Sequence, residues 1–341
     1  MGPLQAVREF MVQIGYPAER TDVRRRAPWM TSAAARHFQS AGLLPAGYVV
    51  LPVTRAAPDA PARRAGGRRP VILYSHGHGQ HRSSSLSLVE NLASYGYVVV
   101  TVDHTYDAGQ VEFSGGRVET YAMPALSPTL PPDEEERIVR KAVRMRVTDV
   151  RYTLAELGRA VRRDAPALPA GLRDIMDLSR TGMFGHSPGG ATDAEAMSGG
   201  VAIGAGANLD GGLFGDVVTR GPDAPFRLLG ADRDDDTTWL NTWPHLRSWR
   251  RFLGLTGAEH FTFSTTRPSS RRPRRGSGRH PSNSPPSSAH WSGTARSPCS
   301  ARSCWPSSAC SCATVPRPSW TDPARGVRSW SSGRRDSVNR K

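Results

Sequence analysis

The residues of this 341-residue chain best suited to chemistry form a serine-centred turn, Gly185-His186-Ser187-Pro188-Gly189. Glycines on both sides of a serine let the backbone turn sharply from a strand into a helix, and this pushes the hydroxyl out above the edge of a sheet. An apolar run at 181–184 precedes the turn, and a stretch of small residues at 190–197 follows it. The pattern predicts that Ser187 is a nucleophile; the simpler alternative is a structural Gly-Ser turn.

A serine hydroxyl attacks well only when a base removes its proton, so a histidine and an orienting carboxylate are required. In a strand–turn–helix arrangement of this kind, the acid and then the histidine follow the serine along the chain. His260 is the histidine with the best context, because it follows the last apolar run. For the acid, Asp210 and Asp232 each lie at the end of an apolar run, where ligands bind in open α/β sheets. Spacing alone does not decide whether Asp210 or Asp232 is the acid.

The negative charge that develops during such an attack needs backbone N–H donors. The run His76-Gly77-His78-Gly79 follows an apolar segment directly, and its glycines allow close backbone approach, so the amide of His78 is the expected donor. A metal site at His76, His78 and His81 is the alternative, and it is disfavoured because no carboxylate lies near them in sequence. We therefore expect neither a metal nor a cofactor.

These residues need a sheet edge to hold them together, and the apolar pattern predicts one. Short apolar runs alternate with helical periodicity, which is typical of a parallel sheet covered on both faces by helices. We expect strands at residues 8–16, 70–75, 97–102, 181–184, 201–209 and 225–229, and helices at 83–95, 133–161 and 190–197. The prediction is a single α/β catalytic domain over residues 1–265.

The formal net charge of +15 is concentrated in the last part of the chain. Residues 266–341 contain 15 Lys and Arg against 2 Asp and Glu, which leaves the body with a net charge of only +2. The body therefore lacks the basic balance of a nucleic-acid-binding protein, and we expect no nucleic-acid partner for it. A nucleic-acid-associated protein that works through its basic tail is a third hypothesis, because arginine-rich segments attract phosphates. All four cysteines, Cys299, Cys304, Cys310 and Cys312, lie in the same segment, and their spacing matches no zinc site.

Residues 266–341 are rich in Arg, Ser and Pro, have few aliphatic residues and show no periodicity. Such a segment cannot bury enough apolar surface to offset its chain entropy, so we expect a disordered basic tail. An alternative interpretation is translation in a shifted reading frame. It rests on the excess of arginine over lysine, which is typical of GC-rich coding DNA, and on the abrupt change of composition after Thr265.

The N-terminal residues 1–20 lack the basic start and unbroken apolar core of a signal peptide, and no apolar run approaches the ~18 residues that a membrane span needs. As written, the chain is expected in the cytoplasm.

Four stretches, at 69–104, 180–197, 206–215 and 257–263, resemble the platelet-activating-factor acetylhydrolase family and its bacterial lipase relatives. The resemblance runs in order from about Arg8 to Ser264. It implies an α/β-hydrolase fold and metal-independent hydrolysis of small-molecule or lipid carboxylic esters, often with short acyl groups. It favours Asp210 over Asp232 as the acid, and it places the base at His260 and the first oxyanion donor at His78.

The sequence departs from the family pattern in three places. Pro188 stands where the family has a bulky apolar residue whose N–H is the second oxyanion donor, and proline has no N–H. The tail replaces a final helix after the histidine. The segment before the first expected strand is shorter than in the family, so the N-terminus is a candidate for truncation, and a complete chain would then be secreted. The alternative function is a catalytically impaired relative that binds acyl ligands without efficient turnover.

Overall fold

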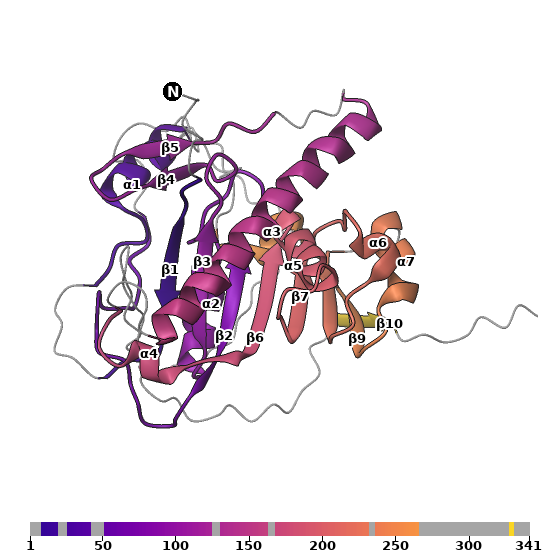
Figure 1. Cartoon of the computed structure of the whole chain (residues 1–341). Helices are drawn as coiled ribbons and strands as arrows, with labels where there is room; N and C mark the ends of the chain where they lie inside the picture. The colour runs from indigo at the N-terminus through magenta and orange to yellow at the C-terminus, as the bar shows by residue number, and fades with distance from the viewer. Residues whose placement is uncertain are drawn as a thin grey trace, which may run out of the picture.

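The computed structural model describes residues 8–19, 26–41, 51–124, 130–162, 168–231 and 236–265, and the backbone of a strand at 327–330. Its centre is a sheet with strand order β1-β3-β2-β6-β7-β8-β9-β10 (Figure 1). The strands are β1 (Met11–Gly15), β2 (Arg69–Ser75), β3 (Val98–Asp103), β6 (Met176–His186), β7 (Ala205–Leu209), β8 (Phe226–Gly230), β9 (Arg250–Leu255) and β10 (Val327–Trp330). The six inner strands are parallel, and β1 and β10 pair antiparallel at the two edges.

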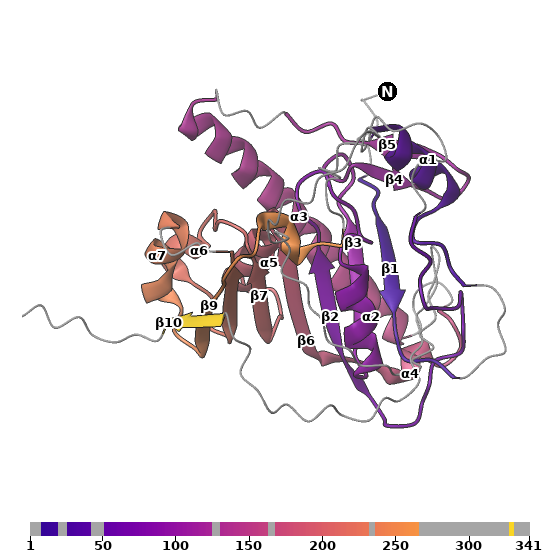
Figure 2. The same cartoon turned by 180° about the vertical axis from the view of Figure 1, so that it is seen from behind.

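Strand β3, which lies between β1 and β2, is buried along its whole length because helices cover the sheet on both sides. Helix α2 (Leu86–Ser94) lies on one face, and α3 (Pro132–Arg162) and α5 (Pro188–Ser198) lie on the other (Figures 1 and 2). Alternate residues of β2 follow this division: Leu73 packs with α3, whereas Tyr74 packs with α2. The parallel sheet with helices on both faces, expected from the sequence, is confirmed.

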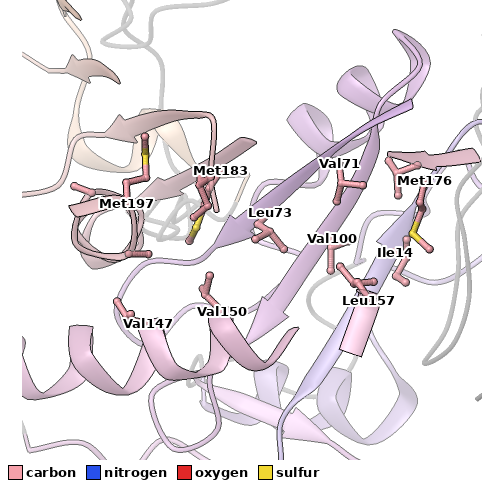
Figure 3. Close-up of a cluster of buried hydrophobic side chains, with 14 of the residues drawn as sticks. Ile14, Val71, Leu73, Val100, Val147, Val150, Leu157, Met176, Met183 and Met197 are labelled. Atoms are coloured by element: carbon pink, nitrogen blue, oxygen red, sulfur yellow. The ribbon is translucent and has the colours of Figure 1, made fainter. Parts of the chain in front are cut away.

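The larger core lies between the sheet and α3. Figure 3 shows Leu73 and Val100 of adjacent parallel strands packed near Val147 and Val150 of α3. Burying each aliphatic side chain of this size stabilises the fold by roughly 1.5–3 kcal/mol, so this layer fixes the sheet beneath the residues at its carboxyl edge.

Shorter elements surround this frame. They are α1 (Ser32–Ala41), the hairpin of β4 (Gln110–Glu112) and β5 (Val118–Thr120), α4 (Leu172–Ile175), α6 (Val217–Arg220), α7 (Thr237–Thr242) and the 3-10 turns Trp243–His245 and His260–Phe263. Glu112 of the hairpin accepts hydrogen bonds from the first amides of α1 at 2.8 Å, so it holds that helix over the hairpin.

The structure also contains elements that the periodicity did not predict, among them β9 and the hairpin. Within the segment expected to be a disordered tail, four residues form β10, which pairs with β9. At these four residues the structure differs from the expected disordered tail. The physical reason is that, without a partner, β9 would be an edge strand with unpaired backbone N–H and C=O groups. The other residues of that segment, with all four cysteines, lie outside the described residues.

Candidate active site

The turn around Ser187 has the strained backbone that the sequence predicts. Strand β6 ends at His186, Ser187 has φ 56° and ψ −128°, and α5 begins at Pro188. A Cβ atom on Gly185 would lie 2.1 Å from the carbonyl of Gly189, and one on Gly189 would lie 2.0 Å from the carbonyl of Ser75. Only glycine fits at these two positions, and the serine hydroxyl is therefore presented at the carboxyl edge of the sheet.

Ser187, His260 and Asp210 meet in one chain of hydrogen bonds. The Ser187 hydroxyl donates to His260 Nε2 over 3.0 Å, and His260 Nδ1–H donates to the Asp210 carboxylate over 2.6 Å. This arrangement gives the base a lone pair that faces the serine and an acid that fixes the imidazole tautomer. It can therefore generate a serine nucleophile.

Asp210 owes its position to the loop that follows β7. Its side chain is 3% exposed, its φ is 56°, and its second carboxylate oxygen accepts the Ala231 N–H at 2.8 Å. The next residue, Gly211, packs so tightly that a Cβ would lie 2.0 Å from the Ser187 carbonyl. Asp232, the other aspartate left open by spacing, lies outside the described residues.

His260 opens a short 3-10 turn, His260–Phe263, whose start is fixed by reciprocal hydrogen bonds between Glu259 and Thr262. Its ring faces that of His186, with centroids 4.6 Å apart and planes at 38°. Burial, reinforced by the neighbouring His260, lowers the pKa of His186 to about 4. His186 is therefore neutral near pH 7 and does not place a second positive charge beside the base.

The loop carrying His78 lies at the end of β2, on a buried ionic support that sequence reasoning missed. Arg146 of α3 pairs with Asp107 at 2.5 Å and also donates to the carbonyl of His76. Burial would raise the pKa of Asp107, but Arg146 holds it well below its ordinary value, so the pair stays ionised. Arg146 lies on the buried face of α3, but the other charged residues around it in that helix leave the sequence without a signal that distinguishes it.

A second hydrogen-bonded Ser–His–Asp set lies beneath this loop and is closed to solvent. The Ser75 hydroxyl donates to His104 Nε2 at 2.9 Å, and His104 Nδ1–H donates to Asp149 at 2.9 Å. All three residues are almost completely buried, and Arg8 pairs with Asp149 at 2.6 Å. Because no substrate can reach it, this set acts as internal support for β2 and α3.

The three histidines weighed as a metal site point to different partners. His76 donates to the Gly77 carbonyl, His78 Nε2 lies 2.6 Å from the Tyr121 hydroxyl, and His81 packs on Trp29 with ring centroids 5.0 Å apart. Burial lowers the pKa of all three. Within the described ranges, no group of three or more His, Cys, Asp or Glu side chains is arranged to hold a metal ion.

A cavity of about 580 Å³ opens over Ser187 and His260. Pro188 and His78 also line this cavity. The apolar part of its lining consists mainly of Met123, Ile138, Val139, Ala142 and Phe214, and its polar part includes Asp236, Thr237 and Thr238. A cavity of this size and character suits a small or single-chain organic ligand with both apolar and polar parts. None of the described helices is long and apolar enough to cross a bilayer.

Comparison with known proteins shows which family the chain matches and which esterases it is similar to. A family model described as platelet-activating factor acetylhydrolase, isoform II, matches residues 31–215, just over half of the chain. A probable 1-alkyl-2-acetylglycerophosphocholine esterase of Arthroderma benhamiae is 32% identical over 209 residues, which are 57% of this chain and 48% of that protein. A platelet-activating factor acetylhydrolase of Bos taurus is 30% identical over 190 residues, covering 50% of this chain and 41% of that protein.

Among solved structures, a ferulic acid esterase from Streptomyces cinnamoneus is similar with a TM-score of 0.58 and 33% sequence identity. The similarity covers 75% of this chain and 69% of that one. Together with the sheet order, it confirms the α/β-hydrolase fold expected from the sequence. The chain spans about half the length of the curated relatives it matches.

Proposed function

Because this chain belongs to the platelet-activating factor acetylhydrolase, isoform II, family, we propose that it hydrolyses carboxylic esters through an acyl-enzyme formed on Ser187. The observation that carries the proposal is the hydrogen-bond chain from Ser187 through His260 to Asp210, at 3.0 and 2.6 Å. Those distances are within the range in which a base removes a serine proton.

In the proposed reaction, His260 Nε2 takes the proton of Ser187 as its Oγ attacks the ester carbonyl carbon. Asp210 stabilises the imidazolium that forms, and the His78 N–H stabilises the negative charge on the substrate oxygen. His260 then gives the proton to the departing alcohol, which leaves the acyl group on Ser187. Water, activated by the same histidine, releases the acid.

The class of substrate is inferred from the residues that line the cavity. Its apolar lining from α3, at Ile138, Val139 and Ala142, suits an apolar chain or ring, and its polar lining at Asp236 and Thr238 suits a polar group. The names of the relatives suggest two ester classes to test, an alkyl-acetyl-glycerophosphocholine and a ferulate ester.

The experiment compares hydrolysis of p-nitrophenyl acetate, methyl ferulate and an alkyl-acetyl-glycerophosphocholine by the wild type and by Ser187→Ala. Ser198→Ala, at the far end of the same helix, is the matched control. We expect turnover of at least one ester that disappears in Ser187→Ala and persists in Ser198→Ala. Equal rates in the wild type and Ser187→Ala would contradict the proposal.

One observation favours a second candidate, a member that binds acyl ligands without efficient turnover. Pro188, next to the nucleophile, has no N–H to serve as the second oxyanion donor. On this alternative, the esters bind in the cavity, as measured by calorimetry, but none is hydrolysed faster by the wild type than by Ser187→Ala.

A further inference from the structure

A buried glutamine connects the separate loops that carry the parts of the site. Gln80 Oε1 accepts the N–H of Gly77, the residue before the oxyanion donor His78, at 3.0 Å. Its Nε2 donates to the hydroxyl of Ser264, at the end of the turn that His260 opens, at 3.2 Å. The same Oε1 lies 3.1 Å from Nδ1 of His186. The Gln80 side chain thus contacts three parts of the site. They are the loop at residues 76–79 that carries His78 (the oxyanion loop), the turn that carries the base His260, and His186, the residue before the nucleophile.

His186 extends this connection to the base itself. Its Nε2–H donates to the backbone carbonyl of His260 at 2.9 Å, and its ring lies against the imidazole of that residue. The His186 side chain is almost completely buried, so few other groups can take over the hydrogen bond to the carbonyl. His186 is also the residue directly before Ser187 in the chain. A shift of the His186 ring would therefore displace both the nucleophile, Ser187, and the base, His260.

The packing around the pair leaves little room for adjustment. A Cβ on Gly77 would lie 2.8 Å from both His186 Nδ1 and Gln80 Oε1, which means that the oxyanion loop rests directly on these two side chains. Ser264, in turn, donates to the carbonyl of Ser84 at 3.1 Å and so joins the turn of the base to the segment just after Gln80. None of these groups belongs to the chain of hydrogen bonds that moves the proton.

We propose that Gln80 and His186 are positioning residues for ester hydrolysis, which together hold the His78 amide, the Ser187 hydroxyl and the His260 ring in one geometry. The inference rests on the proposed function. These three groups come from three separate loops, so their relative placement depends on the contacts that join those loops. A misplacement of about 1 Å can cost on the order of 100-fold in rate.

The first test is Gln80→Met, which keeps the length of the side chain and removes both hydrogen bonds of Gln80, to the Gly77 N–H and to the Ser264 hydroxyl. The matched control is Gln110→Met, another buried glutamine, which lies in β4 and donates to the Met30 sulfur at 3.8 Å. We expect kcat for p-nitrophenyl acetate to fall about 10- to 100-fold in Gln80→Met with KM little changed. Gln110→Met is expected to keep the kcat of the wild type. Melting temperatures and circular dichroism of both variants show whether each is folded.

The second test separates positioning from simple packing at His186. His186→Gln keeps an N–H donor for the His260 carbonyl, whereas His186→Phe keeps the aromatic face but has no donor. We expect the glutamine variant to retain the higher kcat. A higher kcat in the phenylalanine variant would show that ring packing alone matters and would overturn the role assigned to the hydrogen bond.

The double variant Gln80→Met/His186→Phe tests whether the two residues act through one connection. We expect its kcat to be close to that of the poorer single variant, because residues in contact are not additive. Losses that multiply would contradict a shared role, as would a folded Gln80→Met with the kcat of the wild type.

If instead the wild type shows no turnover that depends on Ser187, the proposed function fails. The rate at which a fluorophosphonate labels Ser187 then tests the positioning pair separately, with a slower rate expected in Gln80→Met and an unchanged rate overturning the pair.

Discussion

Restoring a backbone N–H beside the nucleophile is the perturbation with the largest expected gain. Pro188 is the first residue of α5, and it flanks Ser187 in the cavity that His78 also lines. The N–H of a first helical residue has no partner within the helix, so a non-proline residue at this position would leave its N–H free for the substrate oxygen. Pro188→Ala and Pro188→Leu both restore that donor.

The size of the gain follows from the value of one oxyanion donor. Losing such a donor costs about 100- to 1000-fold in kcat, or about 2.7–4 kcal/mol of transition-state stabilisation. We therefore expect kcat to rise by up to about 100-fold in both variants. Stability should fall by no more than about 1 kcal/mol, because proline at a compatible helix start mainly restricts the unfolded chain.

The assay is steady-state hydrolysis of p-nitrophenyl acetate, with thermal unfolding measured alongside. Pro132→Ala, at the first residue of α3, is the matched control for replacing a proline at a helix start, and it should leave kcat unchanged. A gain in the leucine variant without one in the alanine variant would assign the effect to the side chain. No gain in either would refute the argument that the missing N–H limits the reaction.

Three further predictions concern the frame around the site. Burial raises the pKa of Asp193 well above its ordinary value, so the folded protein keeps a proton that the unfolded chain releases, and stability falls as pH rises above the unfolded value. Urea unfolding at pH 5 and pH 8 should show a smaller loss in Asp193→Asn than in the wild type; an equal loss would contradict this assignment. Gly189→Ala, whose Cβ would lie 2.0 Å from a carbonyl oxygen, should lower the melting temperature and activity, whereas Gly204→Ala, with its nearest contact at 3.5 Å, should change neither. Arg146→Met should lower the free energy of unfolding by about 3–5 kcal/mol, because it leaves the buried Asp107 carboxylate unpaired, and a loss below about 1 kcal/mol would refute that role.

The parts of the site that the sequence predicted are those with strong local signals. The turn at Ser187 needs glycines where a Cβ cannot fit, and strands β2 and β3 each contain an unbroken run of apolar residues, so both features can be read from a short window. The strand ends then place Asp210 at the same sheet edge as Ser187, because parallel strands finish on one side.

The parts that could not be predicted depend on contacts between distant segments. Gln80 meets Ser264 across 184 residues of sequence, and Arg146 meets Asp107 across 39, so no local pattern reveals either pair. Strand β9 begins with two arginines and includes a glycine, so its apolar signal is too weak to separate it from a loop. The hairpin β4–β5 has only three residues in each strand, which is too short for alternation to be recognised.

The central claim is that Ser187 is a nucleophile activated by His260 and Asp210. Mass spectrometry of the protein after reaction with a fluorophosphonate tests it most directly, because the reagent reports attack by the serine and needs no knowledge of the natural ester. We predict a single adduct on the peptide that contains Ser187, absent in Ser187→Ala and formed far more slowly in His260→Ala. An adduct elsewhere in the chain, or equally fast labelling in His260→Ala, would contradict the account.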